Sequence, residues 1–342
     1  MNRPSGDEAD IMRRRTFIRD MLSAAGLVIA PGVIDSAARL DPVDTSSASR
    51  ARQVAELEAR VHARGLDFPT VLTLDQLSAL VRDYVAARDA ARRAGIDHRR
   101  VYSSMAYLAA FIAANLSSWQ EYGKAVLWYG EALDHAGRAD DREAAGWIAA
   151  RSTLLAVHRG DHRQAMHDAA YAVVTSPRGQ LGAILGNALA ASTAARMGHR
   201  EVALMALRDA ERATEYAGEE TFTAYSCPWY RVGRFASEVY TQLGDTKRAR
   251  AIQDQAWGAY PSGAATDRTF LALDRADCLR QEGYPREAAR HATQTLLSLR
   301  PECAVPILLD RADEVADSIG TAGRSDTEEL RHVLRRSRII EG

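Results

Sequence analysis

The sequence is poor in cysteine, proline and aromatic residues, and it carries almost no net charge. Three cysteines in 342 residues, without a CxxC or a Cys/His ligand spacing, exclude a disulfide framework and indicate free thiols in a reducing compartment. A net charge of -1 excludes a general basic field for nucleic acid. The 10 prolines are few, and the abundant Ala, Arg and Leu residues favour helices. The function of this mostly helical chain therefore has to be sought in local patterns.

Motifs of the common enzyme classes are also missing. There is no Gly-x-Ser-x-Gly, and the glycines at 179–186 follow a helical segment, so they do not match a phosphate loop. His158 and His162 have the spacing of metal ligands on one helix, but Gly160-Asp161 between them indicates a turn. A carboxylate-rich segment interrupted by Arg311 is typical of a solvated helix face; it contains Asp310, Asp313, Glu314 and Asp317. We expect no catalytic residue, no metal site and no cofactor, with an enzyme on a helical scaffold as an alternative.

The start of the chain allows two interpretations. Arg14-Arg15-Thr16-Phe17-Ile18 resembles a degenerate twin-arginine export signal, and an apolar stretch follows at 21–34. Pro31 and Gly32 interrupt that stretch, which is too short to span a membrane as a stable helix. The segment is either an export signal for a folded protein or a helix that packs on the rest of a cytoplasmic chain. We expect a cytoplasmic location and no stable membrane insertion, with export by the twin-arginine route as the alternative.

The most informative pattern is a repeat between residues 98 and 299. A turn signal recurs at positions 120, 160, 198, 244 and 283, and glycine occupies the last four of them. A small residue follows each turn in the next helix and again two helical turns later: Ala125, Ala165, Ala203, Ala249 and Ala288, then Ala132, Ala172, Ala210, Ala256 and Thr295. Small residues at a fixed period are typical of stacked helical hairpins, because they let two helices approach closely. We predict ten antiparallel helices, broken near the five turn positions.

The pattern divides the chain into four predicted parts. Residues 1–50 are the basic and apolar segment with a linker, and residues 98–299 are five divergent hairpins. Residues 51–97 contain two helices, marked by apolar stripes such as Val54, Leu57 and Val61, and we expect them to cap the hairpins at the N-terminal end. Residues 300–342 contain two more helices, which we expect to cap the C-terminal end. The predicted fold class is all-α.

The hairpins resemble the tetratricopeptide repeat. The match rests on Gly160-Asp161, Gly198 and Gly244-Asp245 at the turns and on the alanines of the second helices. It is poor where the family has a large aromatic residue in the first helix, because this chain has Ala149, Asn187, Gly233 and Ala272 there. The resemblance implies a tetratricopeptide-like helical-hairpin solenoid, a right-handed superhelix whose concave groove binds a protein or a peptide.

A narrower resemblance covers almost the whole chain. The Arg-Arg-Thr-Phe-Ile start, the apolar stretch ending at Pro31, the helix with Val54 and the divergent repeats resemble the C-terminal effector region of actinobacterial Xre-type transcriptional regulators. In those proteins a helix-turn-helix domain precedes the arginine-phenylalanine motif, and here too few residues precede Arg13 for such a domain. The resemblance implies a role in transcriptional or signalling control without direct nucleic-acid binding by this chain alone.

The predicted groove supplies the candidate site. The first helix of each hairpin should line the concave surface, which gives Tyr107, Trp147, His158, Ser192, Arg196, Arg231, Arg234, Glu238, Asp277 and Arg280 as candidate ligand-binding residues. An aromatic half leading into guanidinium groups suits an extended peptide with an acidic side chain or a terminal carboxylate. Alternatively, the arginines pair with Glu238, Asp277 and Asp274 to join adjacent repeats. We predict a non-catalytic regulatory or adaptor protein, and a homodimer is a further option that the sequence leaves open.

Overall fold

The computed structural model describes residues 47–68, 74–93, 95–177, 179–215, 222–300, 303–320 and 324–341. These residues form fourteen α-helices, and no β-strand occurs among them. The helices are α3 (Ser47–Asp67), α4 (Leu74–Ala91), α5 (His98–Ser118), α6 (Tyr122–Arg138), α7 (Arg142–His158), α8 (His162–Thr175), α9 (Leu181–Arg196), α10 (Arg200–Thr214), α11 (Trp229–Gln242), α12 (Thr246–Ala259), α13 (Ala265–Gln281), α14 (Pro285–Leu297), α15 (Pro306–Ile319) and α16 (Arg324–Glu341). The predicted all-α class is confirmed. The arginine-rich start and the apolar stretch 21–34 lie outside the described residues.

The ten helices predicted between residues 98 and 299 are α5 to α14. Their hairpin turns fall at the five predicted positions, and each has a residue with positive φ: Gln120 (60°), Gly160 (70°), Gly198 (76°), Gly244 (75°) and Gly283 (90°). A left-handed residue just after a helix lets the chain reverse direction and satisfies the last carbonyl groups. In two turns the next residue, Asp161 or Asp245, then accepts a hydrogen bond from a backbone N–H at the start of the following helix. The Gly-Asp pair therefore ends one helix and begins the next.

The repeated alanines pack where the two helices of each hairpin cross. Ala125, Ala165, Ala203, Ala249 and Ala288 are completely inaccessible to solvent. At one position where the tetratricopeptide family has a large aromatic residue, a Cβ on Gly233 would lie 3.4 Å from the Cβ of Ala256. A larger side chain there would push the two helices apart. The small residue at this position of α11 is therefore matched by a close crossing with α12.

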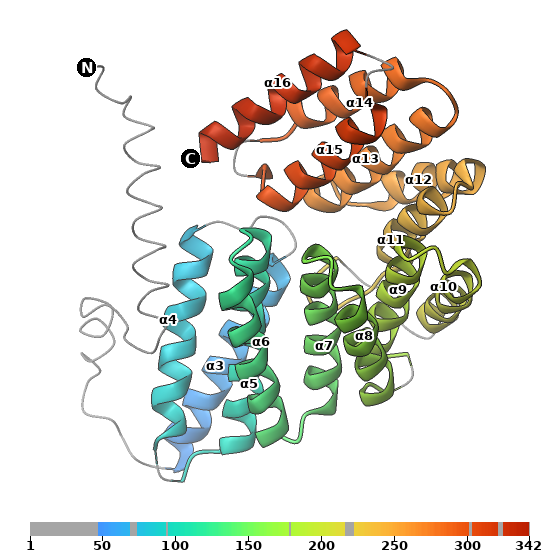
Figure 1. Cartoon of the computed structure of the whole chain (residues 1–342). Coiled ribbons are helices and arrows are strands. Elements are labelled where there is room, and N and C mark those ends of the chain that lie inside the picture. The colour runs from blue at the N-terminus through green and yellow to red at the C-terminus, as the bar shows by residue number, and fades with distance from the viewer. Residues whose placement is uncertain are drawn as a thin grey trace, which may run out of the picture.

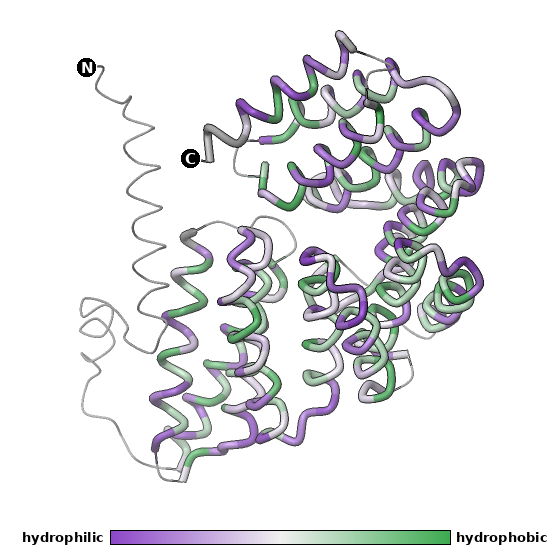
Figure 2. The backbone as a smooth tube through the Cα atoms, viewed as in Figure 1, coloured by the Kyte–Doolittle hydropathy of each residue, from purple (hydrophilic) through white to green (hydrophobic). Residues whose placement is uncertain are grey.

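The hairpins stack side by side into one curved array (Figure 1). The first helix of each hairpin contacts the first helix of the next, in the order α5, α7, α9, α11, α13 and α15. Helix α9 is mostly hydrophobic along its length (Figure 2) because α7, α8, α10 and α11 pack around it. The curvature brings the two ends of the array together, and the side-chain amide of Gln120 donates a hydrogen bond to Asp310 on α15.

The helices on either side of the five repeats also form pairs. Helices α3 and α4 pack on α5, and α15 and α16 pack on α13 and α14. Helix α3 begins at Ser47, so it starts within the segment that the sequence indicated as a linker. Because α15 follows the stacking order of the first helices, it contributes side chains to the concave face.

Candidate functional site

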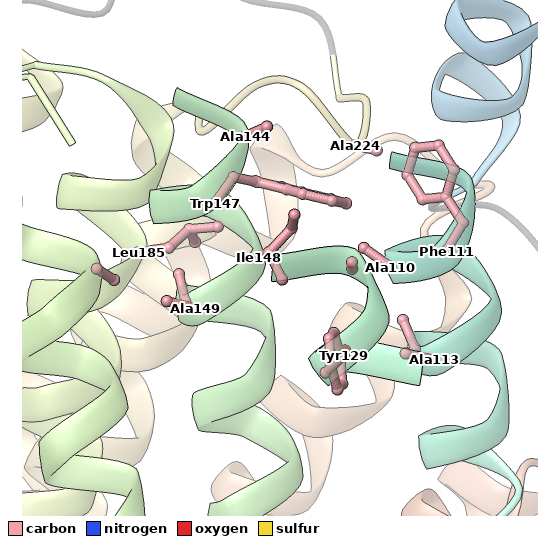
Figure 3. Close-up of a cluster of buried hydrophobic side chains, with 14 of the residues drawn as sticks. Ala110, Phe111, Ala113, Tyr129, Ala144, Trp147, Ile148, Ala149, Leu185 and Ala224 are labelled. Carbon is pink, nitrogen blue, oxygen red and sulfur yellow. The ribbon is translucent and has the colours of Figure 1, made fainter. Parts of the chain in front are cut away.

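Trp147, expected in the groove as an aromatic anchor, is instead part of the hydrophobic core. Only 1% of its surface is exposed. In Figure 3 its ring extends from α7 into the cluster that contains Phe111 and Ile148, and the ring centroids of Trp147 and Phe111 are 5.5 Å apart. The expectation that this side chain faces an open groove is therefore wrong. Its burial means that substitution would affect the stability of the fold.

Tyr107 is half-buried because a segment of the chain covers it. Residues 222–228, which precede α11 and are called the strap below, cross to the N-terminal helices. Ala224 N–H donates to the carbonyl of Gly65 at 2.8 Å, and the Tyr225 hydroxyl donates to the carbonyl of Val61 at 2.8 Å. The centroids of the Tyr225 and Tyr107 rings lie 5.5 Å apart. The aromatic half of the concave face is thus occupied by the protein itself.

Gly65 is required for this contact. A Cβ built on Gly65 would lie 2.0 Å from a ring carbon of Tyr225, far inside van der Waals distance. The Tyr225 ring also stacks on His62, with centroids 5.4 Å apart and planes inclined by 8°. The fit on α3 therefore depends on the absence of a side chain at Gly65.

Arg231 supports the strap rather than a ligand. Its Nη1 donates to the carbonyl oxygens of Thr223 at 3.0 Å and Ser226 at 2.6 Å, and the residue is buried. The guanidinium carbon lies 5.6 Å from the centroid of Phe222. Sequence reasoning placed Arg231 in the binding groove because its helical register is right, but the register alone does not reveal a loop that folds over it.

Five other candidates come together around a cavity of about 90 Å³ in the charged half of the concave face. They are His158 on α7, Ser192 and Arg196 on α9, and Arg234 and Glu238 on α11. Helix α15 closes the cavity from the other side with Ile307, Asp310, Arg311 and Glu314. We call this space the concave cavity. Asp277 and Arg280 do not line it and form an ion pair with each other at 2.7 Å.

Glu238 is the centre of the charges on α9 and α11. Arg196 Nε lies 2.7 Å from Oε1 of Glu238, and Arg234 Nη1 lies 3.4 Å from its Oε2. Burial opposes the ionised form of Glu238, but the two guanidinium groups and a hydrogen bond from Ser192 outweigh it and lower its pKa to about 2. Glu238 is therefore charged at neutral pH. Arg196 and Arg234 therefore form the internal ion pairs that the sequence analysis gave as the alternative to ligand binding.

Arg311 is the charged residue that sequence reasoning missed. It lies in the segment interpreted as a solvated face, yet only 6% of it is exposed. Its guanidinium lies 3.1 Å from Asp274, 3.7 Å from Asp277 and 3.0 Å from Glu314. The sequence does contain a signal for this burial. Arg311 lies at helical spacing from Leu308 and Val315, which places it on the buried stripe of α15.

Two side-chain atoms of residues that line the cavity have no hydrogen-bond partner. They are the Nε of Arg234 and the Nδ1 of His158, and both atoms are buried. Burial, together with the charges of Arg234 and Arg196, lowers the pKa of His158 to about 3, so its ring is neutral at pH 7. The Arg234 guanidinium carbon lies 4.2 Å from the ring centroid of Phe270, which holds it over an apolar wall. Buried polar groups are normally paired, so these two atoms are unsatisfied positions on residues that line the cavity.

The described residues contain no group of three or more His, Cys, Asp or Glu residues that could hold a metal ion. In the same part of the chain, no helix is both long and apolar enough to cross a membrane. Cys227, Cys278 and Cys303 are all buried, and none of them forms a disulfide. None of the three lines the concave cavity.

Comparison with known proteins gives likenesses in structure but none in sequence. No protein-family model matches the sequence, and no curated protein matches it. The crystal structure of the P58(IPK) TPR domain is similar over 97% of this chain and 98% of that chain, with 12% sequence identity and a TM-score of 0.20. A likeness of this level supports no argument about function. The hairpin architecture rests instead on the helix pairing described above.

Proposed function

We propose that this chain is a non-catalytic regulatory or adaptor protein, and that its concave cavity receives one side chain of a peptide or protein partner. The observation that carries the proposal is the pair of unpartnered buried atoms on residues that line the cavity, Arg234 Nε and His158 Nδ1. An arginine Nε–H is a donor, so it calls for an acceptor such as a carboxylate oxygen. The proposed partner group is an acidic side chain or a terminal carboxylate.

The size of the cavity supports a single side chain. Its volume is about 90 Å³, which is room for a few water molecules. Sites for whole small molecules usually have about 300–1,000 Å³. A cavity this small would hold the end of one residue, while the rest of the partner lies on the neighbouring first helices.

The local charge also supports an acidic group. At His158 the charges of Arg234 and Arg196 lower the pKa, and they act more strongly there than the opposing charge of Glu238. Arg311, Asp310 and Glu314 line the α15 side of the cavity, so an anion would be favoured beside Arg234 and Arg196, on the α9 and α11 side. The internal ion pairs hold the arginines in fixed positions, so pairing and ligand binding are compatible.

A role in transcriptional or signalling control would follow if the partner peptide changed the curvature of the array. The cavity walls come from both ends of the array, since Tyr122 begins α6 and Ile307 lies on α15. A ligand that prefers one separation of these ends would shift the population toward it. The sequence resemblance to regulator effector regions motivates this part of the proposal.

The alternative is an exported binding protein. It predicts a mature N-terminus near Ala38 rather than Met1, and N-terminal sequencing distinguishes the two.

The test uses the intact chain and a displayed library of random peptides with free C-termini. We expect selected peptides to be enriched in acidic residues or to bind through their terminal carboxylate. Arg234→Ala and Arg196→Ala should each weaken binding of a selected peptide by about 1.5–3 kcal/mol, measured by fluorescence anisotropy. Arg280→Ala is the matched control, because Arg280 is on the same face but pairs with Asp277 outside the cavity.

Thermal melting of the same variants separates binding from stability. If Arg234→Ala and Arg196→Ala lower the melting temperature and leave peptide affinity equal to that of Arg280→Ala, the arginines only join the repeats. No enrichment of acidic peptides would also contradict the proposal.

A further inference from the structure

A second cavity lies away from the concave face. It occupies about 530 Å³ between α12 and α14, with α13 as its floor, and it shares no lining residue with the concave cavity. Its volume falls within the range of about 300–1,000 Å³ that is usual for small-molecule sites. We call it the α12–α14 cleft.

The cleft has an aromatic wall over an apolar floor. Trp257 on α12 is 43% exposed, and the guanidinium of Arg268 lies over its ring. The buried side chains of Leu271 and Ala272 lie below it on α13. A planar apolar ligand would cover both surfaces.

Two arginines give the cleft a positive charge. The guanidinium carbon of Arg268 lies 4.1 Å from the ring centroid of Trp257, and its Nη1 donates to the carbonyls of Trp257 and Tyr260. These contacts use only one of its three nitrogens and hold the group in place. Arg275 pairs with Asp254, the one carboxylate of the lining, which is 70% exposed on its side chain. Arg275 is thus paired with a carboxylate, whereas Arg268 is held in place and still has donors that could bind an anion.

His291 determines which hydrogen-bonding group a ligand of the cleft must carry. Its ring makes a hydrogen bond to the backbone of Ala272, while its Nε2 is buried and has no partner. Burial and the nearby charge of Arg275 lower the pKa of His291, so the ring is neutral at pH 7. With the proton on the nitrogen that faces the Ala272 backbone, Nε2 is an acceptor. A ligand that satisfies it must carry a hydroxyl or an N–H donor.

We propose that the α12–α14 cleft binds a small hydroxylated aromatic carboxylate. The aromatic ring would lie against Trp257, the carboxylate would accept hydrogen bonds from Arg268, and the hydroxyl group would donate to Nε2 of His291. An inorganic anion would use only the arginine, and a neutral aromatic compound would leave it unpaired. A hydroxylated aromatic carboxylate satisfies all three features.

Isothermal titration calorimetry of the intact chain with 4-hydroxybenzoate tests the proposal, with benzoate and phenol as matched ligands. We expect saturable one-to-one binding of 4-hydroxybenzoate, about fivefold weaker binding of benzoate because the bond to His291 is lost, and at least about tenfold weaker binding of phenol. Absence of saturable binding at millimolar 4-hydroxybenzoate would overturn the proposal. Equal affinity for benzoate would overturn the role of His291.

Variants locate the binding in the cleft. Arg268→Gln and Trp257→Ala should each weaken 4-hydroxybenzoate binding by about tenfold, and His291→Phe should abolish the preference over benzoate. Arg286→Gln, an exposed arginine on α14 outside the cleft, is the control and should bind as the unchanged chain does. Ser298→Trp fills the rim without removing a buried contact, so it should block binding even if another variant is unstable. Binding that survives Ser298→Trp, Arg268→Gln and Trp257→Ala would place the ligand elsewhere and overturn the assignment.

Discussion

The first helices of the hairpins form both halves of the concave face, but the two halves differ in how far the rest of the chain covers them. The aromatic half, around Tyr107 and Trp147, is covered by the strap, whereas the charged half around Glu238 keeps a cavity. Apolar surface is stabilised by any apolar cover, because the hydrophobic effect has no direction. Charged groups need partners at fixed distances and angles, so they do not pack without gaps. The apolar groove residues thus become core, whereas five of the polar ones line the candidate site.

Substitution of Trp147 should have the largest effect. If the aromatic half is core, Trp147→Ala removes a fully buried indole and lowers the free energy of unfolding by about 3–5 kcal/mol. Urea denaturation followed by circular dichroism measures the change. Trp229→Ala is the control, because Trp229 is exposed at the start of α11. A loss at Trp147 no greater than that at Trp229 would show that the aromatic half is open.

Substitution of Arg311 tests the charged half in the same way. Arg311→Ala leaves Asp274 buried without its cation, and we expect a loss of about 3–5 kcal/mol in the free energy of unfolding. Arg331→Ala removes an arginine from an exposed pair with Asp317 and should cost no more than about 1 kcal/mol. Equal urea midpoints for the two variants would mean that the Arg311 contacts contribute little.

Removal of the Tyr225 side chain sharpens the comparison, because it opens one half only. Tyr225→Ala deletes the stacked ring and the hydrogen bond to Val61, with an expected loss of about 2–3 kcal/mol. The Ala224 amide should then exchange with deuterium faster, while binding of an acidic peptide in the concave cavity stays unchanged. Tyr171→Ala, at an exposed position on α8, is the control. Unchanged exchange at Ala224 would show that the strap does not depend on Tyr225.

The smallest expected effect is the pH dependence due to His158. Its pKa is about 3 in the folded chain, against about 6.5 in an unfolded one. Between these values the unfolded chain binds the extra proton, so stability falls as the pH falls, by about 2 kcal/mol from pH 7 to pH 5. His158→Gln should remove that part of the slope in urea denaturation at the two pH values. The carboxylate of Glu238, with a pKa of about 2, loses its contribution only at lower pH. An identical slope in the variant would mean that His158 is not buried as a neutral ring.

The sequence predicted the parts of the fold that local signals determine. Glycine at the turns and alanines at the crossings give the hairpins and their five breaks, because both depend on residues close in the chain. The same register brought His158, Ser192, Arg196, Arg234 and Glu238 to one cavity. The strap was not predicted, since its partners on α3 are distant in sequence. Arg311 was missed for another reason: its carboxylate neighbours suggested a solvated face, although its spacing from Leu308 and Val315 indicates the buried stripe of α15. No local pattern near Tyr225 indicates that it would reach α3.

The contact between Gln120 and Asp310 gives the array a property that an open stack of hairpins lacks. In an open stack each repeat contacts only its neighbours, so unfolding can begin at one end and spread repeat by repeat. Here residues 190 positions apart are bonded at the rim, and Tyr225 is bonded to Val61, 164 positions away. Loss of α15 would therefore also remove a support of the first hairpin at the other end of the array. Such cross-links favour a single cooperative unfolding transition, and they make this chain a poor candidate for shortening by whole repeats.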